Sequence, residues 1–354
     1  MPINDPSKPT DDRPPSPWVG LVTIVLTLAG WTAAPLLIRE FTTDVDPWTS
    51  NGWRYGFAAV LWAPWLLWQA SRGGIPEGLW KAALVPAFIN AAAQVAFTKA
   101  HYLIEPALLT FGLRMQIVCV TVGAALLFPV ERAIIRRPLF LVGIGLVLVG
   151  TLTTAGLQPG ITEGASATGV GLAMAAGAGY AMYALAVRWF FHGTNPMTAF
   201  AAISQITAFC MVGLMIPFGE RSGLTALDMA PGRFGLFFLS AVVGIAAGHV
   251  LYYISIARLG VTVSSGVVQT QPFTVGAASY ALFGEVLRPL QWVSGSVAVG
   301  GAILMLVVQH RSKPVTRSNE PAKPEGGDAE AEATRGESDS PGAVDASRPG
   351  TTRA

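Results

Sequence analysis

The sequence has 354 residues, of which 52% are hydrophobic and 12% are charged, and its mean hydropathy is +0.49. A soluble core of this length could not bury so much apolar surface, so the composition predicts an integral membrane protein. The net charge of +2 is too small to indicate a nucleic-acid partner. The histidines and cysteines show no metal-ligand spacing, so we expect neither a metal nor a cofactor.

Apolar runs of about 20 residues, the length that crosses a bilayer, alternate with Pro, Gly and charged residues. They predict an all-α membrane protein with about ten transmembrane helices. In chain order, the expected spans are Pro17 to Leu37, Trp48 to Trp68, Leu79 to Leu103, Pro106 to Phe128, Pro138 to Ala155, Thr168 to Phe191, Pro196 to Phe218, Phe234 to Ala257, Val261 to Phe283 and Leu290 to Val308.

The two ends of the chain differ in composition from the apolar runs. We expect residues 1–16 to form a disordered tail. Residues 309–354 are rich in Pro, Glu, Ser and Gly and contain no aromatic residue, so they cannot offset the entropy of ordering, and we expect a second disordered tail there.

The distribution of basic residues predicts the orientation, because lysine and arginine in short loops resist translocation. Most of them fall on the side shared by both termini, which we therefore expect to be cytoplasmic in the cell membrane. The opposite side holds only Arg39, Lys99, Arg221, Arg233 and Arg288.

The halves of the chain share a sequence pattern. Thr-Val-Gly-Ala-Ala occurs at 121–125 and again at 274–278, each time five residues after a glutamine, Gln116 or Gln269, and before a glutamate, Glu131 or Glu285. This favours duplication over chance similarity of apolar helices. We expect five-helix repeats at 17–155 and 168–308, joined by an external linker at 156–167. An odd number of crossings inverts the second copy, and inverted repeats place a binding site between the halves.

The stretch from Tyr252 to Leu304 contains Tyr-Tyr-Ile-Ser-Ile-Ala-Arg-Leu-Gly-Val-Thr, Gln-Pro-Phe and Phe-Gly-Glu. These motifs resemble the EamA-like transporters of the drug/metabolite transporter superfamily, and Trp31, Arg39 and Arg54 fit the family pattern more loosely. The resemblance implies ten helices, cytoplasmic termini and transport of small metabolites. Cys119 stands where the second half has Pro272, which leaves open whether the fourth helix bends like the ninth.

Arg114 is the first candidate for the substrate site, because a guanidinium inside a span is very costly without a partner. A carboxylate, backbone carbonyls or an anionic group of the substrate would each satisfy it. Gln116 and Gln269 are candidates as a matching pair, with bonds to neighbouring helices as the alternative.

The remaining candidates are polar or aromatic side chains inside predicted spans. Asn90 and Gln94 form a polar stripe that could line a cavity or join helices. His249 lies near Tyr252, and it could be a neutral hydrogen-bonding group or a proton carrier. Tyr183 and Trp31 are possible wall residues.

These features favour a secondary transporter over the two rival classes. No Asp or Glu lies at the centre of a span, which argues against a cation exporter and leaves amino acids or related neutral, zwitterionic or anionic solutes, with export expected. An integral membrane enzyme is one alternative, although no catalytic arrangement is visible, and a structural or receptor role is another. We expect a small-molecule substrate and membrane lipids as partners.

Overall fold

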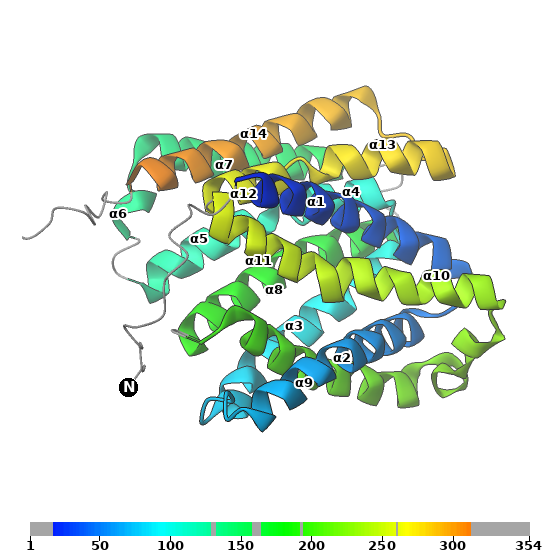
Figure 1. Cartoon of the computed structure of the whole chain (residues 1–354). Helices are drawn as coiled ribbons and strands as arrows, with labels where there is room; N and C mark the ends of the chain where they lie inside the picture. Colours follow the sequence, from blue (N-terminus) through cyan, green and yellow to red (C-terminus); the bar gives the residue numbers. More distant parts are fainter. Residues whose placement is uncertain (1–16, 129–131, 158–163, 192–193, 260, 313–354) are drawn as a thin grey trace, which may run out of the picture. The chain divides into compact units, whose positions relative to one another are not determined.

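The computed structural model describes residues 17–128, 132–157, 164–191, 194–259 and 261–312. These residues form helices joined by turns, with no strand in the described part, which confirms the predicted all-α class (Figure 1). Residues 1–16, the predicted tail past Ser312 and Glu131 lie outside the described residues.

The helices of the first half occupy the first five predicted spans. In chain order they are α1 (Pro17–Glu40), the 3-10 turn η1 (Phe41–Thr43), α2 (Pro47–Ser71), α3 (Leu79–His101), α4 (Pro106–Gly112), α5 (Met115–Leu127), the short α6 (Arg132–Ile135) and α7 (Pro138–Gly156).

The helices of the second half occupy the other five. They are α8 (Gly164–Phe190), α9 (Pro196–Phe218), the 3-10 segment η3 (Glu220–Asp228), α10 (Pro231–Ala241), the π-helical turn η4 (Val242–Ala247), α11 (Gly248–Leu259), α12 (Val261–Val268), α13 (Gln271–Phe283) and α14 (Pro289–Ser312). α8 begins inside the predicted linker, and α14 continues past its predicted end at Val308.

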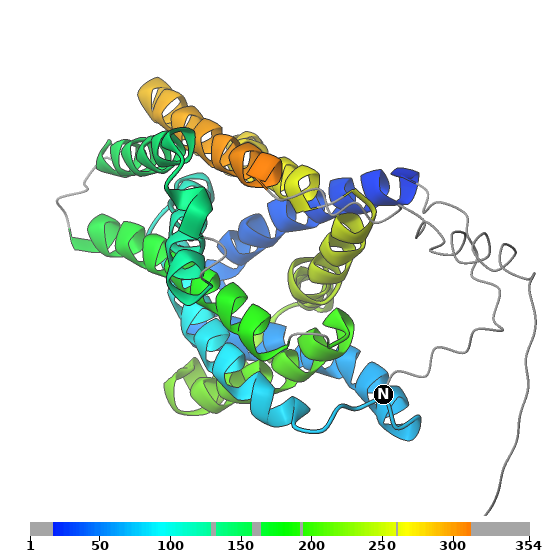
Figure 2. The same ribbon diagram turned by 90° about the vertical axis from the view of Figure 1, so that its left-hand side faces the viewer.

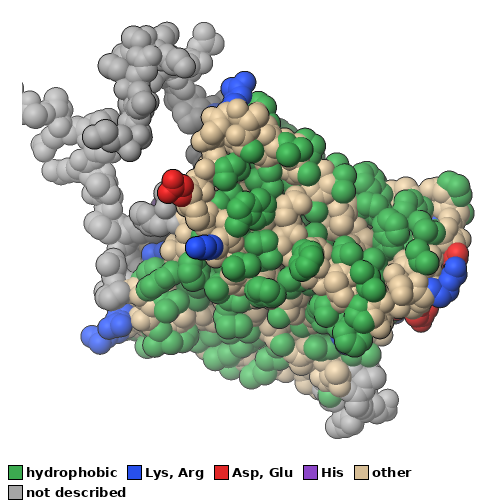
Figure 3. Space-filling model, turned by 90° about the horizontal axis from the view of Figure 1, so that it is seen from below, with side chains coloured by type: hydrophobic (Ala, Val, Ile, Leu, Met, Phe, Trp, Pro, Cys, Tyr) green, Lys and Arg blue, Asp and Glu red, His purple; other side chains and the backbone are tan. Residues whose placement is uncertain are grey.

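Eight helical segments in the described part are long and apolar enough to cross a membrane, so the protein is a multi-pass membrane protein. The other two predicted spans are α2, which buries Asn51 and Arg54, and the interrupted pair α12 and α13. On the face drawn in Figure 3, hydrophobic side chains cover the middle and charged side chains lie towards the two ends. This is the distribution that lipid requires of a spanning bundle.

The fourth and ninth spans are both interrupted, which answers the question that the sequence left open for the fourth span. In the fourth, the N–H of Arg114 donates to the carbonyl of Phe111 at 3.0 Å and the N–H of Gln116 to that of Leu113 at 2.9 Å. These i to i−3 bonds tighten the turn between α4 and α5 without a proline. In the ninth, Pro272 lacks the N–H that would continue the helix, and α13 starts afresh at Gln271. The fourth span therefore breaks as the ninth does.

The most extensive contacts between helices join the two halves of the chain. α7 packs along α14, α2 along α9, α3 along α8 and α1 along α11 (Figures 1 and 2). Between α7 and α14 the backbones approach closely, because a Cβ on Gly150 would lie 2.5 Å from the backbone nitrogen of Ala298. The two interrupted spans meet where α4 packs on α13.

Candidate functional site

Arg114 connects the two interrupted spans. It lies in the turn between α4 and α5 and is 6% exposed. Its Nη1 donates to Oε1 of Gln269 at 2.7 Å, its Nη2 to Oε1 of Gln271 at 3.2 Å and its Nε to the carbonyl of Thr110 at 3.2 Å. Both glutamines flank the break between α12 and α13, so the guanidinium holds the two breaks together.

The charge of Arg114 is not neutralised by these contacts. Amide and carbonyl oxygens satisfy its N–H groups, but in the described part of the chain no carboxylate forms an ion pair with it. A buried guanidinium without a counter-charge is costly, and an anionic group brought beside it would lower that cost.

Gln271 extends this cluster to α1, and the sequence analysis did not select it. Its Nε2 donates to the carbonyl of Trp31 at 2.6 Å. The ring of Trp31 lies 5.6 Å from the ring of His249 and 5.1 Å from the ring of Tyr252, both on α11. Five predicted site residues, Arg114, Gln269, Trp31, His249 and Tyr252, thus belong to one connected cluster.

A cavity of about 330 Å³ lies next to the cluster, towards the end of the bundle where α8 finishes and α9 begins. The ring of His249 stacks on the ring of Phe200 at 4.8 Å, and Phe200 lines the cavity. The volume suits a small metabolite. Among its lining residues are Tyr183, Val187, Phe191, Phe200, Ile203 and Tyr253. Tyr183 therefore lines this cavity, and its contact with a solute stays a prediction.

Three other predicted residues lie outside the Arg114 cluster. The Nδ2 of Asn90 reaches Oγ1 of Thr207 at 3.3 Å and the hydroxyl of Tyr55 at 3.5 Å, which joins α3 to α9 and α2. The backbone carbonyl oxygen of Gln94 accepts from Nδ2 of Asn51 on α2 at 3.4 Å. These contacts support the interhelical alternative for the polar stripe. Gln116 is half-buried on α5, and within the described residues its side chain has no hydrogen bond to Arg114.

Arg54 is a second buried cation, which the sequence indicated only through the family pattern. It is 2% exposed, and its Nε donates to Oγ of Ser240 on α10 at 3.1 Å. Within the described residues its Nη1 has no hydrogen-bond partner. Its Nη2 lies beside Gly244, against which Ala34 of α1 packs. Buried donors are normally satisfied, so an unpaired Nη1 at this depth is unusual among the described residues.

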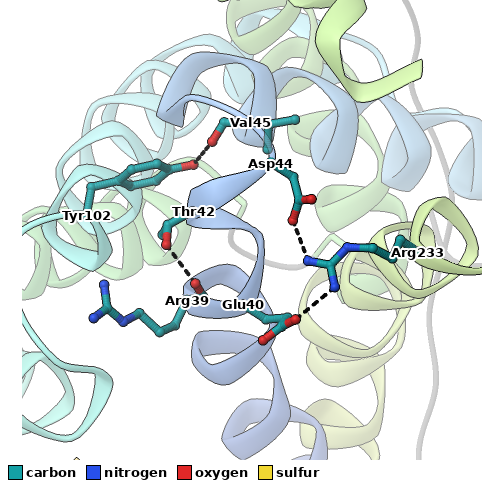
Figure 4. Close-up of polar contacts among 7 residues, drawn as sticks. All are labelled: Arg39, Glu40, Thr42, Asp44, Val45, Tyr102 and Arg233. Atoms are coloured by element: carbon teal, nitrogen blue, oxygen red, sulfur yellow. Dashed lines mark hydrogen bonds and ion pairs between the residues drawn. The ribbon is translucent and has the colours of Figure 1, made fainter. Parts of the chain in front are cut away.

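A network of charged side chains joins the two halves of the chain at one end of the bundle. We call this end the distal end, and it consists of residues 39–47, 101–105, 219–233 and 284–288. Arg233 of α10 donates to Glu40 at 3.0 Å and also pairs with Asp44, both in the first half (Figure 4). Arg39 pairs with Glu285 at 3.1 Å. The hydroxyl of Tyr102 donates to the carbonyl of Val45 at 2.6 Å (Figure 4). Ion pairs thus tie the halves together at the distal end, opposite the cavity.

Two carboxyl groups at the distal end have shifted pKa values. Burial opposes the charge of Asp46, but hydrogen bonds from Thr49, Trp48 and the N–H of Glu220 outweigh it and lower the pKa of this carboxyl. At Glu105, burial and the nearby charge of Glu285 raise the pKa, although Arg39 partly offsets them. At the distal end, the surroundings therefore stabilise the charged form of Asp46 and destabilise the charged form of Glu105.

The fold and site together describe a multi-pass helical membrane protein with a charged residue held between two interrupted spans. Residues 167–307 match the EamA-like transporter family. This match identifies the second half of the chain as EamA-like, confirms the resemblance seen in its motifs and indicates a membrane transporter of the drug/metabolite superfamily.

A solved structure titled "Crystal structure of protein" has a similar fold, with a TM-score of 0.56 and 15% sequence identity, over 84% of this chain and 100% of that chain. At this identity the likeness shows the fold alone. No curated protein matches the chain.

Proposed function

We propose that the protein is a secondary transporter that moves a small metabolite bearing a carboxylate, such as an amino acid or a related organic anion, by alternating access. The observation that carries this proposal is the buried Arg114, whose partners in the described chain are neutral oxygens contributed mainly by the opposite half. A solute carboxylate would supply the missing charge through the planar fork of the guanidinium. We assign the protein no enzymatic activity.

The arrangement of contacts supports alternating access. Arg114 lies on the interrupted fourth span, and Gln269 and Gln271 lie on the interrupted ninth span. Inverted-repeat transporters bind their substrate at such interrupted helices. The distal end is tied by ion pairs between the halves, whereas the cavity lies towards the other end. Breaking one set of contacts while forming another would expose the site to each side in turn.

Location and direction complete the proposal. The scarcity of basic residues at the distal end favours an orientation with both termini in the cytoplasm and the cavity on the cytoplasmic side of the cell membrane. We expect the solute to leave the cell. A topology reporter fused after Val308 should be active only in its cytoplasmic form, and activity outside the cell would contradict this orientation.

The substrate proposal is tested by flux into proteoliposomes. Metabolite profiling of cells with and without the protein supplies the candidate solutes, and the purified protein is then assayed with each. We expect Arg114→Gln to reduce carboxylate flux more than about tenfold and Arg114→Lys to raise the KM, because lysine keeps the charge but loses the fork.

The control is Arg72→Gln, since Arg72 is exposed at the end of α2 and lies over the ring of Trp68. This variant should transport normally. If Arg114→Gln transports the same carboxylates as well as the Arg72 variant does, Arg114 does not recognise the solute and the proposal is wrong.

A further inference from the structure

A groove runs between α3 of the first half and α9 of the second half, which pack side by side. Its volume is about 730 Å³, and ligand pockets in proteins have volumes of about 300–1,000 Å³. Among its lining residues are Leu84, Phe88 and Val95 of α3 and Phe209, Cys210 and Gly213 of α9. Gln205 also lines the groove, but its Nε2 already donates to the carbonyl oxygen of Ala59 at 2.8 Å.

The groove opens to the outside of the bundle, within two spans that are long and apolar enough to cross a membrane. At its rim, the side chain of Phe209 is 80% exposed and that of Phe88 is 59% exposed. Apolar walls offer water no hydrogen bonds, and in a bilayer this face meets hydrocarbon. The groove therefore requires an apolar occupant.

The length of the groove matches one leaflet of a bilayer. From Leu84 to Val95, α3 rises about 16 Å at about 1.5 Å per residue. Half of the hydrocarbon core of a bilayer is about 15 Å thick. An extended acyl chain of a phospholipid in one leaflet would thus lie along the whole groove.

A basic side chain stands at the end of the groove where its occupant would carry a headgroup. Lys81 lies three residues before Leu84 and seven before Phe88, so helical spacing puts all three on one face of α3. Lys81 is exposed and, within the described residues, forms no ion pair, even with Glu77 in the turn before α3. The neighbouring Trp80 is 48% exposed, which is typical of the membrane interface. A phosphate at this level would find a complementary charge.

We propose that the groove between α3 and α9 binds an anionic phospholipid. One acyl chain lies against Leu84, Phe88 and Phe209, and the phosphate pairs with Lys81. Surrounding lipid tails are as apolar as the groove, so the chain contacts favour no particular lipid, and the charge of Lys81 provides the selectivity. The bound chain contacts both halves of the protein. This site is separate from Arg114 and does not depend on the proposed solute.

The test uses the purified full-length protein in phosphatidylcholine vesicles. The probe is a phosphatidylglycerol with a photoactivatable diazirine on one acyl chain, and the same chain on a phosphatidylcholine is its neutral counterpart. After illumination, mass spectrometry of peptides locates the labelled residues. We expect the phosphatidylglycerol probe to label groove residues of α3 and α9 about fivefold more than the neutral probe, the effect of one basic residue at the membrane surface. Equal labelling by the two probes would overturn the proposal.

Lys81→Gln separates the charge from the groove. This variant should lose the preference for phosphatidylglycerol, because both probes then meet a neutral side chain. Arg311→Gln is the control, since Arg311 is exposed in the last turn of α14, away from the groove. It should keep the preference. A preference that survives Lys81→Gln would reject the assigned headgroup contact.

Gly213→Leu fills the groove from α9. A Cβ at Gly213 would meet no atom within 4 Å, so the added side chain has room and the helices need not move. We expect labelling of the groove to fall more than about fivefold with both probes. The control is Gly171→Leu on α8, an exposed position with equally open surroundings, which should label as the original protein does.

Unchanged labelling of the groove in Gly213→Leu would show that no acyl chain lies there. If a second copy of the protein covers the groove instead, the probes will label other faces and oxidation will join two Cys210 residues in a disulfide-linked dimer, which also overturns the proposal. If Gly213→Leu melts at a lower temperature than Gly171→Leu does, Lys81→Gln decides alone, because its exposed side chain does not support the fold.

Discussion

Gln116 and Gln269 occupy matching places in the two halves but have different surroundings. Gln269 accepts from Arg114 at 2.7 Å, whereas Gln116 lies outside that cluster in the described part of the chain. We expect Gln269→Leu to reduce flux strongly, because it leaves a buried guanidinium N–H without its acceptor. Gln116→Leu is the matched control and should retain most flux. Equal losses in the two variants, measured at equal membrane abundance, would contradict the assignment.

Asp46 begins α2 and fixes it to the second half. Its carboxylate accepts from the N–H groups of Trp48 and Thr49 and, at 3.0 Å, from the N–H of Glu220. Asp46→Ala should lower the free energy of unfolding by about 1–2 kcal/mol, as loss of a helix N-cap does. Thermal melting of the purified variant measures the change.

The stabilisation by Asp46 should also depend on pH. Its pKa is lower in the folded protein than its usual value near 4, so the carboxylate stabilises the fold fully above that value. The contribution is lost as the pH falls through the lower pKa of the folded state. The difference in melting temperature between the original protein and Asp46→Ala should therefore shrink in acid. A difference that grows in acid would contradict the assignment.

Among individual residues, the sequence predicted the cost of burying Arg114 but not the residues that meet it. The cost follows from one residue and its depth, which hydropathy supplies. The contacts with Gln269 and Gln271 join residues 155 and 157 positions apart, which is more than a whole repeat, and helical spacing carries no information about such pairs. The burial of Arg54 was overlooked because this residue lies near the predicted start of a span, where a charge usually reaches water.

At the level of helices, close packing between α7 and α14 makes a sharp prediction. A Cβ at Gly150 would lie 2.5 Å from both the backbone nitrogen of Ala298 and the backbone oxygen of Ser294, which cannot move aside. Gly150→Ala should cost about 1–3 kcal/mol through overpacking. Gly145→Ala, on the same helix with open space around it, should melt like the original protein. Equal melting temperatures for the two variants would show that the interface is looser than described.

The positions of the helices could be predicted from the sequence, and so could the bend in the ninth span, but the break in the fourth span could not. Each span was predicted from the length and apolarity of its run of residues, and the structure has long apolar helices at these runs. The break in the ninth span could have been read from Pro272. The break at Arg114 involves i to i−3 hydrogen bonds between ordinary residues, and no residue type in that segment requires them.

For the molecule as a whole, the charged distal network should control access from that side. Arg233 joins Glu40 and Asp44 of the first half, so Arg233→Gln removes two ties between the halves. We expect this variant to expose the distal end more often. A cysteine placed at Ala34 should then react faster with a water-soluble maleimide added from the distal side.

Arg221→Gln is the matched control, because in the described part of the chain Arg221 pairs locally with Asp228, seven residues along the chain. It should leave the labelling rate unchanged. If Arg233→Gln also labels at the original rate, the network does not limit access.

The division into two five-helix repeats stays a prediction, but the packing agrees with it in one respect. α1 packs on α11 and α3 on α8, which is the exchange of partners that a pseudo-two-fold axis would produce. Chain order alone could not show these pairings, since each joins helices far apart in the sequence. The shared Thr-Val-Gly-Ala-Ala motif indicated the duplication of the halves, not these pairings.

The π-helical turn at Val242–Ala247 gives one span a tolerance for changes in length that the other helices lack. Deleting a residue within it would convert i to i+5 hydrogen bonds into i to i+4 bonds and leave the flanking α10 and α11 facing as they do now. The same deletion in α7 would rotate every later side chain by about 100° and turn Gly150 away from α14. Insertions and deletions among related chains should therefore concentrate at this turn, with the contact between Trp31 and His249 preserved on either side of the change.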